Sequence, residues 1–222
     1  PNPYNSETYY NLGLVLFYQE KYDHAFDAFY KATWSNEQQE MSYYYLAAIE
    51  TRRGNYESAL EMVEKGLVKN THNIKGRSLK TVILRKLCKE EEAKAWIAEN
   101  LKVDAFDYVS MFEQVYLSED EAPVLEGMNG QMRDFHEHYL LAARDYAEAG
   151  CYEEAVKILD QCTKAQPMLA YYKAYYLGKI GKREEGAELY KEAEKRSPLY
   201  CFPNKLEDIA VMADAIQQNP LG

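Results

Sequence analysis

The sequence lacks the short motifs on which most enzyme active sites depend. It has no glycine-rich loop that could cradle phosphates, no dinucleotide-binding fingerprint and no nucleophile motif. Its acidic clusters, at residues 90–92, 119–121 and 153–154, stand where second helices begin or in a loop, and negative charge favours a helix N-terminus. We therefore interpret these clusters as structural, and predict a protein that is not an enzyme and needs no cofactor.

Histidine is scarce as well, with four residues in 222. The one metal-like cluster runs from Asp134 to His138, and on a helix His136 and His138 would point about 200° apart. Asp134 and His138 are four residues apart and could meet, but two ligands are too few for a metal site. The sequence therefore predicts no metal.

Long apolar runs and an excess of positive charge are also missing. No run approaches the roughly 20 apolar residues that span a bilayer. The 26 Lys and Arg are outnumbered by 36 Asp and Glu, and the net charge of −10 argues against a general affinity for nucleic acid or anionic membranes. The four cysteines show no Cys-x-x-Cys spacing, so we expect reduced thiols and a cytoplasmic location. Because the chain begins with Pro1 and not Met, we expect it to be a piece of a longer protein.

Tyrosine, in contrast, is abundant, and many of the 21 tyrosines recur at a regular interval. Between Tyr9 and Ala32, apolar residues fall on one face of each of two successive predicted helices. An offset of 34 residues carries the pattern into a second copy, from Tyr9, Leu12, Tyr22 and Ala25 to Tyr43, Leu46, Tyr56 and Ala59. Further copies run through Ala93, through Tyr139, Tyr152 and Ala155, and through Gly186, Tyr190 and Ala193. The chain is therefore predicted to be a repeat array.

These copies resemble the tetratricopeptide repeat, a helix–turn–helix unit of about 34 residues. The resemblance covers most of residues 6–198. It implies an all-α fold, a right-handed α-α superhelix with about five repeats and a degenerate central unit. We divide the chain into residues 1–103 (repeats one to three), 104–130 (degenerate), 131–198 (repeats four and five) and 199–222 (a terminal helix leading into a further repeat). Ala25, Ala59 and Ala155 should then lie wedged between paired helices.

The degenerate unit breaks the regular spacing. An apolar row predicts one helix at residues 104–118, and Pro123 disfavours helix in the residue before it. Gly127 and Gly130 are predicted to bracket a loop, which makes this segment a candidate hinge. The first helix of copy four is predicted at about residues 131–149, closed by Gly150.

The family resemblance places the first helix of each repeat along a concave face. The groove predicted for copies one and two is largely aromatic, and contains Tyr10, Leu14, Phe17, Tyr18, Tyr44 and Tyr45. The alternative is that half of these side chains are core between repeats. Asn11 falls on a position that carboxylate-binding members of the family use, but its Lys and Asn companions are absent, which argues against that function.

Positive charge is concentrated in one run. Eight cations and no acidic residue lie from Lys65 to Lys89. By the same resemblance, Lys75, Arg85 and Lys86 would project into the groove beside Arg52, and would favour an acidic ligand. The alternative is a solvated face that is balanced by neighbouring acids.

Three functional hypotheses follow. The first is a non-catalytic scaffold that binds a protein or peptide partner in the groove, with a preference for an acidic one. The second comes from a resemblance to the repeat region of large bacterial proteins with an N-terminal β-rich, mutarotase-like domain, which implies an auxiliary carbohydrate-binding or domain-organising module. The third is self-association through the apolar stripe of Leu206, Ile209, Ala213 and Ile216.

Overall fold

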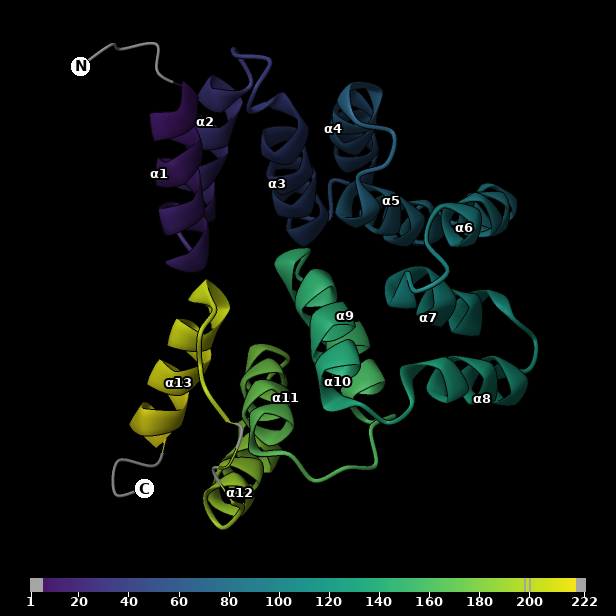
Figure 1. Cartoon of the computed structure of the whole chain (residues 1–222). Helices are drawn as coiled ribbons and strands as arrows, with labels where there is room; N and C mark the ends of the chain where they lie inside the picture. Colours follow the sequence, from purple (N-terminus) through teal and green to yellow (C-terminus); the bar gives the residue numbers. More distant parts are fainter. Residues whose placement is uncertain (1–5, 198, 200, 219–222) are drawn as a thin grey trace. The chain divides into compact units, whose positions relative to one another are not determined.

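The computed structural model describes residues 6–197, 199 and 201–218. These residues form 13 α-helices and no β-strand, which confirms the predicted all-α fold (Figure 1). The helices are α1 (Ser6–Tyr18), α2 (Tyr22–Ala32), α3 (Gln39–Arg52), α4 (Tyr56–Lys69), α5 (Ile74–Lys86), α6 (Glu90–Val103), α7 (Tyr108–Leu117), α8 (Glu121–Met132), α9 (His136–Glu148), α10 (Tyr152–Leu159), α11 (Pro167–Lys179), α12 (Arg183–Glu194) and α13 (Leu206–Gln218).

The chain divides into two compact units. The first contains residues 1–124 and the short segment Glu148–Gly150, and the second contains residues 125–147 and 151–222. The division at residue 124 falls inside the segment 104–130 that was predicted to be degenerate. The role of that segment as a hinge stays a prediction.

In the first unit, helices pair within each repeat and stack between repeats. Helix α1 packs against α2, α3 against α4 and α5 against α6, while α2, α4 and α6 each pack against the next helix along the chain (Figure 1). Ala25, Ala59 and Ala93 lie at 34-residue intervals in the second helices, and all three are fully buried. Ala155 is fully buried at the corresponding place of copy four, and the buried Gly186 holds that place in copy five. The predicted alanine positions are confirmed.

Aromatic rings fill the space between the first two repeats. Phe29 and Tyr45 stack with their ring centroids 4.7 Å apart and an angle of 5° between the rings, and Phe17 meets Tyr45 at 5.1 Å. A Cβ on Gly13 would lie 2.7 Å from the ring of Phe29, so only glycine lets α1 approach α2 this closely. Glycine and aromatic positions of the repeat are therefore complementary parts of one core.

The turn inside each repeat has one residue in the left-handed region. Glu20 (φ 60°), Gly54 (φ 77°) and Cys88 (φ 57°) lie 34 residues apart, and only the second is glycine. At each turn the amide of this residue donates to the carbonyl three residues earlier, as Gly54 does to Thr51 at 3.0 Å. The following amide reaches back five residues, as Asn55 does to Glu50 at 2.9 Å. This is the Schellman end of a helix, which satisfies carbonyls that the helix leaves free.

In the second unit, α11 packs against α10, α12 and α13. Gly186 allows a close crossing of α12 over α11, since a Cβ there would lie 2.7 Å from the Ala174 carbonyl oxygen. The hydroxyl of Tyr190 donates to Asp214 at 2.6 Å and ties α12 to α13. The terminal helix predicted within residues 199–222 is α13, Leu206–Gln218, and residues 219–222 lie outside the described part of the chain.

Three predicted boundaries are wrong. The helix predicted at 104–118 is shorter, Tyr108–Leu117, because Asp107 accepts the Ser110 amide at 3.0 Å and caps it. The loop predicted between Gly127 and Gly130 is part of the helix α8. Pro123 is the third residue of α8, where its missing N–H has no intrahelical partner to lose.

The first helix of copy four begins later than predicted, at His136 and not at residue 131. Arg133 and Asp134 have φ values of 53° and 51°, and this left-handed pair separates α8 from α9. The end of α9 before Gly150 (φ 76°) is as predicted.

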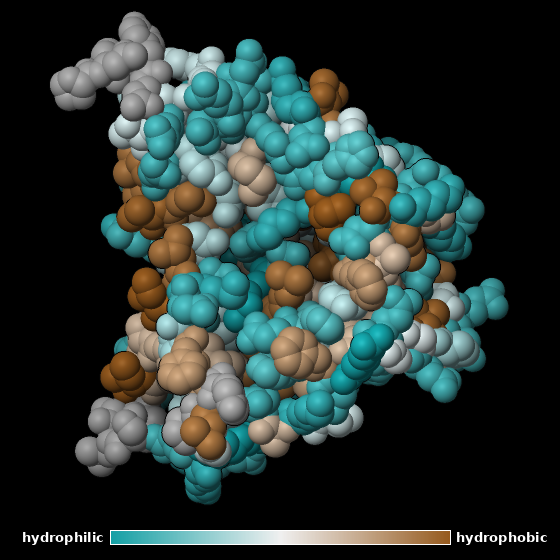
Figure 2. Space-filling view, viewed as in Figure 1, coloured by the Kyte–Doolittle hydropathy of each residue, from teal (hydrophilic) through white to brown (hydrophobic). Residues whose placement is uncertain are grey.

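The face seen in Figure 2 is mostly hydrophilic, with separate apolar patches. Brown residues in that view lie over α13, where Leu206, Ile209 and Ile216 are 51%, 68% and 68% exposed. Among the described helices, none has the length and apolar composition that crossing a bilayer requires.

Candidate functional site

Polar side chains of three first helices converge on one carboxylate in the first unit. The Tyr44 hydroxyl of α3 donates to Glu148 Oε2 at 2.5 Å, and Lys75 Nζ of α5 lies 3.0 Å from both carboxylate oxygens. The Tyr18 hydroxyl, at the end of α1, donates to Glu148 Oε1 at 3.3 Å. We call Tyr18, Tyr44, Arg52, Lys75 and Glu148 the carboxylate cluster.

Arg52 completes the cluster from the end of α3. Its Nε donates to the main-chain carbonyl of Glu148 at 3.0 Å. Its guanidinium lies 4.3 Å from the ring centroid of Tyr22 and 5.8 Å from that of Phe17, so cation–π contacts fix its direction. A Cβ on Gly150 would lie 2.7 Å from Arg52 Cγ. The cluster therefore contacts the segment Glu148–Gly150 at the Glu148 side chain, at the Glu148 carbonyl and at Gly150, where Arg52 leaves no room for a side chain.

Burial makes these contacts strong. The Glu148 side chain is 7% exposed and that of Lys75 is 37% exposed. Charge-assisted hydrogen bonds of this kind are about twice as strong as neutral ones. Burial raises the pKa of Tyr10 and of Tyr45, the negative charge of Glu148 raises both further, and Lys75 opposes the rise. Both phenols therefore stay protonated at neutral pH.

The other residues of the predicted aromatic groove have mixed positions. Phe17 and Tyr45 are buried, so they belong to the core between repeats, as the alternative interpretation had it. Tyr10 and Leu14 are half-buried, and Asn11 is exposed. The Tyr10 ring lies 5.9 Å from Phe29 and 6.3 Å from Tyr45, which places it at the edge of that core.

The cationic run is largely neutralised by neighbouring acids. Arg85, predicted to face the groove, instead binds the fully buried Glu113 through two hydrogen bonds of 2.5 and 3.0 Å. Lys80 pairs with Glu64 at 2.7 Å. Lys65 and Lys89 also pair with acids of their own helices or turns. Lys86 is half-buried. Within the run, only Lys75 is shown to reach the carboxylate cluster.

Sequence reasoning missed Glu148, although a signal was present. It lies two residues before the left-handed Gly150, as Tyr18, Arg52 and Lys86 lie two residues before Glu20, Gly54 and Cys88. Those three had been assigned to the groove because the family resemblance places the first helix of each repeat along a concave face. Glu148 holds the same place at the end of the first helix of copy four.

Metal chemistry has no support in the part of the chain that is described. No group of three or more His, Cys, Asp or Glu side chains there could hold a metal ion. His138 Nδ1 lies 3.0 Å from the Met132 carbonyl, and Asp134 accepts from the Thr163 amide at 2.8 Å and from its hydroxyl. All four cysteines are free thiols.

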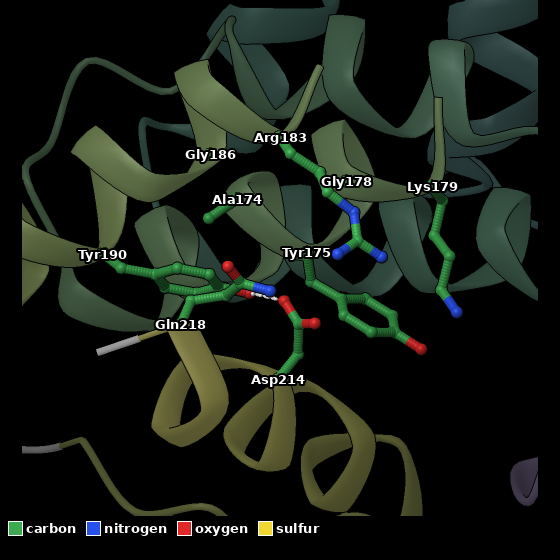
Figure 3. Close-up of a pocket in the computed structure, with 9 residues that line it drawn as sticks. All are labelled: Ala174, Tyr175, Gly178, Lys179, Arg183, Gly186, Tyr190, Asp214 and Gln218. Carbon is green, nitrogen blue, oxygen red and sulfur yellow. Dashed lines mark hydrogen bonds between the residues drawn. The ribbon is translucent and has the colours of Figure 1, made fainter. Parts of the chain in front are cut away.

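The second unit has a small pocket of about 50 Å³ between α11, α12 and α13. Figure 3 shows Arg183 extending from α12 toward Tyr175 of α11, with Asp214 and Gln218 contributed by α13. This volume is about a third of the roughly 150 Å³ of an engineered protein cavity that binds benzene.

Paired helices, buried alanines at 34-residue spacing and repeated Schellman turns define a helical repeat protein with the tetratricopeptide repeat (TPR) fold. Solved structures agree. A tetratricopeptide repeat protein from Parabacteroides merdae is similar, with a TM-score of 0.56 and 17% identity over 98% of this chain and 85% of that one. YrrB, described as a TPR protein with an unusual peptide-binding site, has a TM-score of 0.52 and 19% identity over 76% of this chain and 91% of its own.

The pilF protein of Pseudomonas aeruginosa is similar too, with a TM-score of 0.52 and 15% identity over 94% of this chain and 97% of that one. Identities this low show the fold alone. No family model and no curated protein matches the sequence.

Proposed function

We propose that the chain is a non-catalytic interaction scaffold that binds a segment of a partner protein in the groove formed by α1, α3 and α5. The observation that carries this proposal is the convergence of Tyr18, Tyr44 and Lys75, from three successive first helices, on one carboxylate. Hydrogen-bond donors held in place by a rigid helical frame suit recognition of a peptide. YrrB has the same fold and an unusual peptide-binding site, which is consistent with this function.

The chemistry of the groove favours tight contact over catalysis. Tyrosine supplies a large apolar ring and a polar tip with few rotatable bonds, so ordering it costs little entropy. Tyr44 is 3% exposed and its ring lies 5.5 Å from Lys75 Nζ, which holds the ammonium in place. The described residues of the groove supply donors and no activated nucleophile.

Peptide selection from a displayed library tests the proposal. Selected peptides should bind the wild-type protein and lose at least about tenfold in affinity to Lys75→Met or Tyr44→Phe, as expected when a charged or buried hydrogen bond is lost. Lys65→Met is the matched control, because Lys65 pairs with Glu61 on the second helix α4. Binding that is insensitive to Lys75 and Tyr44 would place the interaction elsewhere.

Self-association through α13 is the second candidate. Leu206, Ile209 and Ile216 lie on one face and are at least half exposed, and this observation favours an apolar contact. Light scattering at increasing concentration should show a mass above that of the monomer, and Ile209→Glu should abolish it. A monomeric mass throughout would rule the candidate out. Nothing in the described groove favours the carbohydrate-binding alternative, which stays a prediction.

A further inference from the structure

The residues of the proposed groove already contact a short piece of the chain itself. Glu148 meets Tyr44 and Lys75 through its carboxylate and Arg52 through its carbonyl, and Gly150 lies against Arg52. An ordinary ion pair needs only the first of these three contacts. Here, within three residues, the protein contacts a carboxylate side chain, a main-chain carbonyl and a glycine that leaves no room for a side chain. A peptide-binding site contacts its ligand in this way.

We propose that Glu148–Gly150 is an internal ligand of this groove, and that the partner segment carries the same pattern and competes with it. The pattern is a glutamate two residues before a glycine at the end of a helix. This inference rests on the proposed function, because it names the chemistry of the partner for the same groove.

The glutamate is specified by three donors. Lys75 Nζ is equidistant, at 3.0 Å, from both carboxylate oxygens, and the hydroxyls of Tyr44 and Tyr18 each donate to a different one of these oxygens. Glutamine would turn an NH₂ group toward one of these donors and leave it unpaired in a buried place. Sites built from buried donors reject such analogues strongly.

The glycine is specified by backbone conformation and space. Gly150 has a φ of 76°, where a side chain is strained. A Cβ would lie 2.7 Å from Arg52 Cγ and 3.3 Å from Arg52 Cα. The guanidinium of Arg52 rests on the Tyr22 ring, so the side chain cannot move away without losing that contact. A partner with alanine at this place would bind more weakly.

An internal ligand lowers the apparent affinity for an external one. Binding then requires the groove to be open, and the apparent dissociation constant rises by the inverse of the open fraction. Removing the charge of Glu148 weakens the internal contact and raises that fraction, while Lys75, Tyr44 and Arg52 remain in place for the partner.

The test uses a synthetic, C-terminally amidated peptide of residues 140–150, LLAARDYAEAG, with a fluorophore at its N-terminus. Amidation removes the terminal carboxylate, so binding reports the glutamate side chain. The peptide should bind Glu148→Gln at least about tenfold more tightly than it binds the wild type. Glu153→Gln, which removes an exposed acid of α10, should bind like the wild type. Adding Lys75→Met to Glu148→Gln should abolish the gain.

Peptides carrying Glu148→Gln or Gly150→Ala should each bind the Glu148→Gln protein at least about tenfold more weakly than the parent peptide. Equal affinity of the parent peptide for the wild type and Glu148→Gln would overturn the inference, as would equal affinity of the three peptides. A further readout does not depend on the folding of any variant. In the wild type, saturating peptide should accelerate amide hydrogen exchange at residues 148–151, and unchanged exchange with bound peptide would also overturn it.

Failure of this inference is distinguishable from failure of the proposed function. If library peptides depend on Lys75 and Tyr44 but lack the glutamate–glycine pattern, the scaffold function is supported and the internal-ligand inference is refuted. Library peptides that bind without Lys75 and Tyr44 would discard both.

Discussion

Replacing Cys88 with glycine should make the protein more stable. Cys88 has a φ of 57° and is exposed at the turn between α5 and α6, where its amide donates to Arg85 at 2.9 Å. The preceding repeat has Gly54 at the same place, where glycine takes this conformation without strain. Cysteine at this position therefore keeps a steric cost that glycine would remove.

The magnitude follows from two opposing terms. A residue with a Cβ costs about 1–2 kcal/mol in the left-handed region. Glycine gives back about 0.4–1 kcal/mol through the larger conformational freedom of the unfolded chain. The net gain for Cys88→Gly then lies between about 0 and 1.6 kcal/mol. Its midpoint, about 0.8 kcal/mol, raises Tm by about 2–3 °C for a chain of 222 residues.

Urea unfolding followed by far-ultraviolet circular dichroism measures this gain. Cys88→Ala is the matched control, because it removes the thiol and keeps the Cβ, and its stability should equal that of the wild type within about 0.5 kcal/mol. Gly54→Ala should change stability in the other direction, by about 1 kcal/mol. A Cys88→Gly variant no more stable than Cys88→Ala would refute the reasoning about the turn.

Three further changes probe the packing, the buried ion pair and the pH dependence of the first unit. Gly13→Val should cost about 1–3 kcal/mol in urea unfolding, because even a Cβ there lies 2.7 Å from the Phe29 ring; wild-type stability would show that α1 can move away. Arg85→Met should cost about 3–5 kcal/mol, since it strands the buried charge of Glu113, and the double variant with Glu113→Met should recover most of this; additive losses would contradict the pairing. Burial raises the pKa of Asp107 above its ordinary 3.8, although hydrogen bonds from serine side chains oppose the rise. The folded state therefore holds this proton more tightly than the unfolded state, and the free energy of unfolding contributed by Asp107 should fall as pH rises above about 3.8. Urea titrations at several pH values should show this dependence lost in Asp107→Asn, which can still cap α7.

The regular part of the fold was predictable because local spacing decides it. The 34-residue interval linked Ala25 to Ala59, and the recurrence of the same pattern in copy four placed Ala155. All three are buried as predicted, since small residues are needed wherever two helix backbones approach closely. The end of the first helix of copy four at Gly150 was likewise expected from glycine. The same turn at Glu20 and Cys88 could be found only by counting from Gly54, because neither residue type indicates a left-handed conformation.

The irregular part was not predictable because tertiary contacts override the local signals. Pro123, Gly127 and Gly130 are typical of a loop, yet they lie in α8, which is anchored by the buried side chains of Met128 and Met132. Apolar burial on one face outweighs the roughly 1 kcal/mol that each glycine costs inside a helix.

The candidate site was predictable in part. Tyr18, Tyr44, Arg52 and Lys75 were predicted to line a groove from their places in first helices, and their role in binding a partner stays a prediction. Glu148, 73 residues beyond Lys75, was not predicted, because sequence spacing says nothing about which distant segment meets a groove. The position of Arg85 was wrong for a related reason. Its partner, the buried Glu113, lies in the irregular helix α7, which the repeat spacing does not place.

The first helices α1, α3 and α5 are proposed to form the recognition surface. Hydrogen–deuterium exchange of the protein with a library-selected peptide tests this directly, because it reports which backbone amides bound peptide protects. We expect protection in α1, α3 and α5, centred on Tyr18, Tyr44 and Lys75, and none in α2, α4 and α6. Protection confined to the second helices would contradict the account.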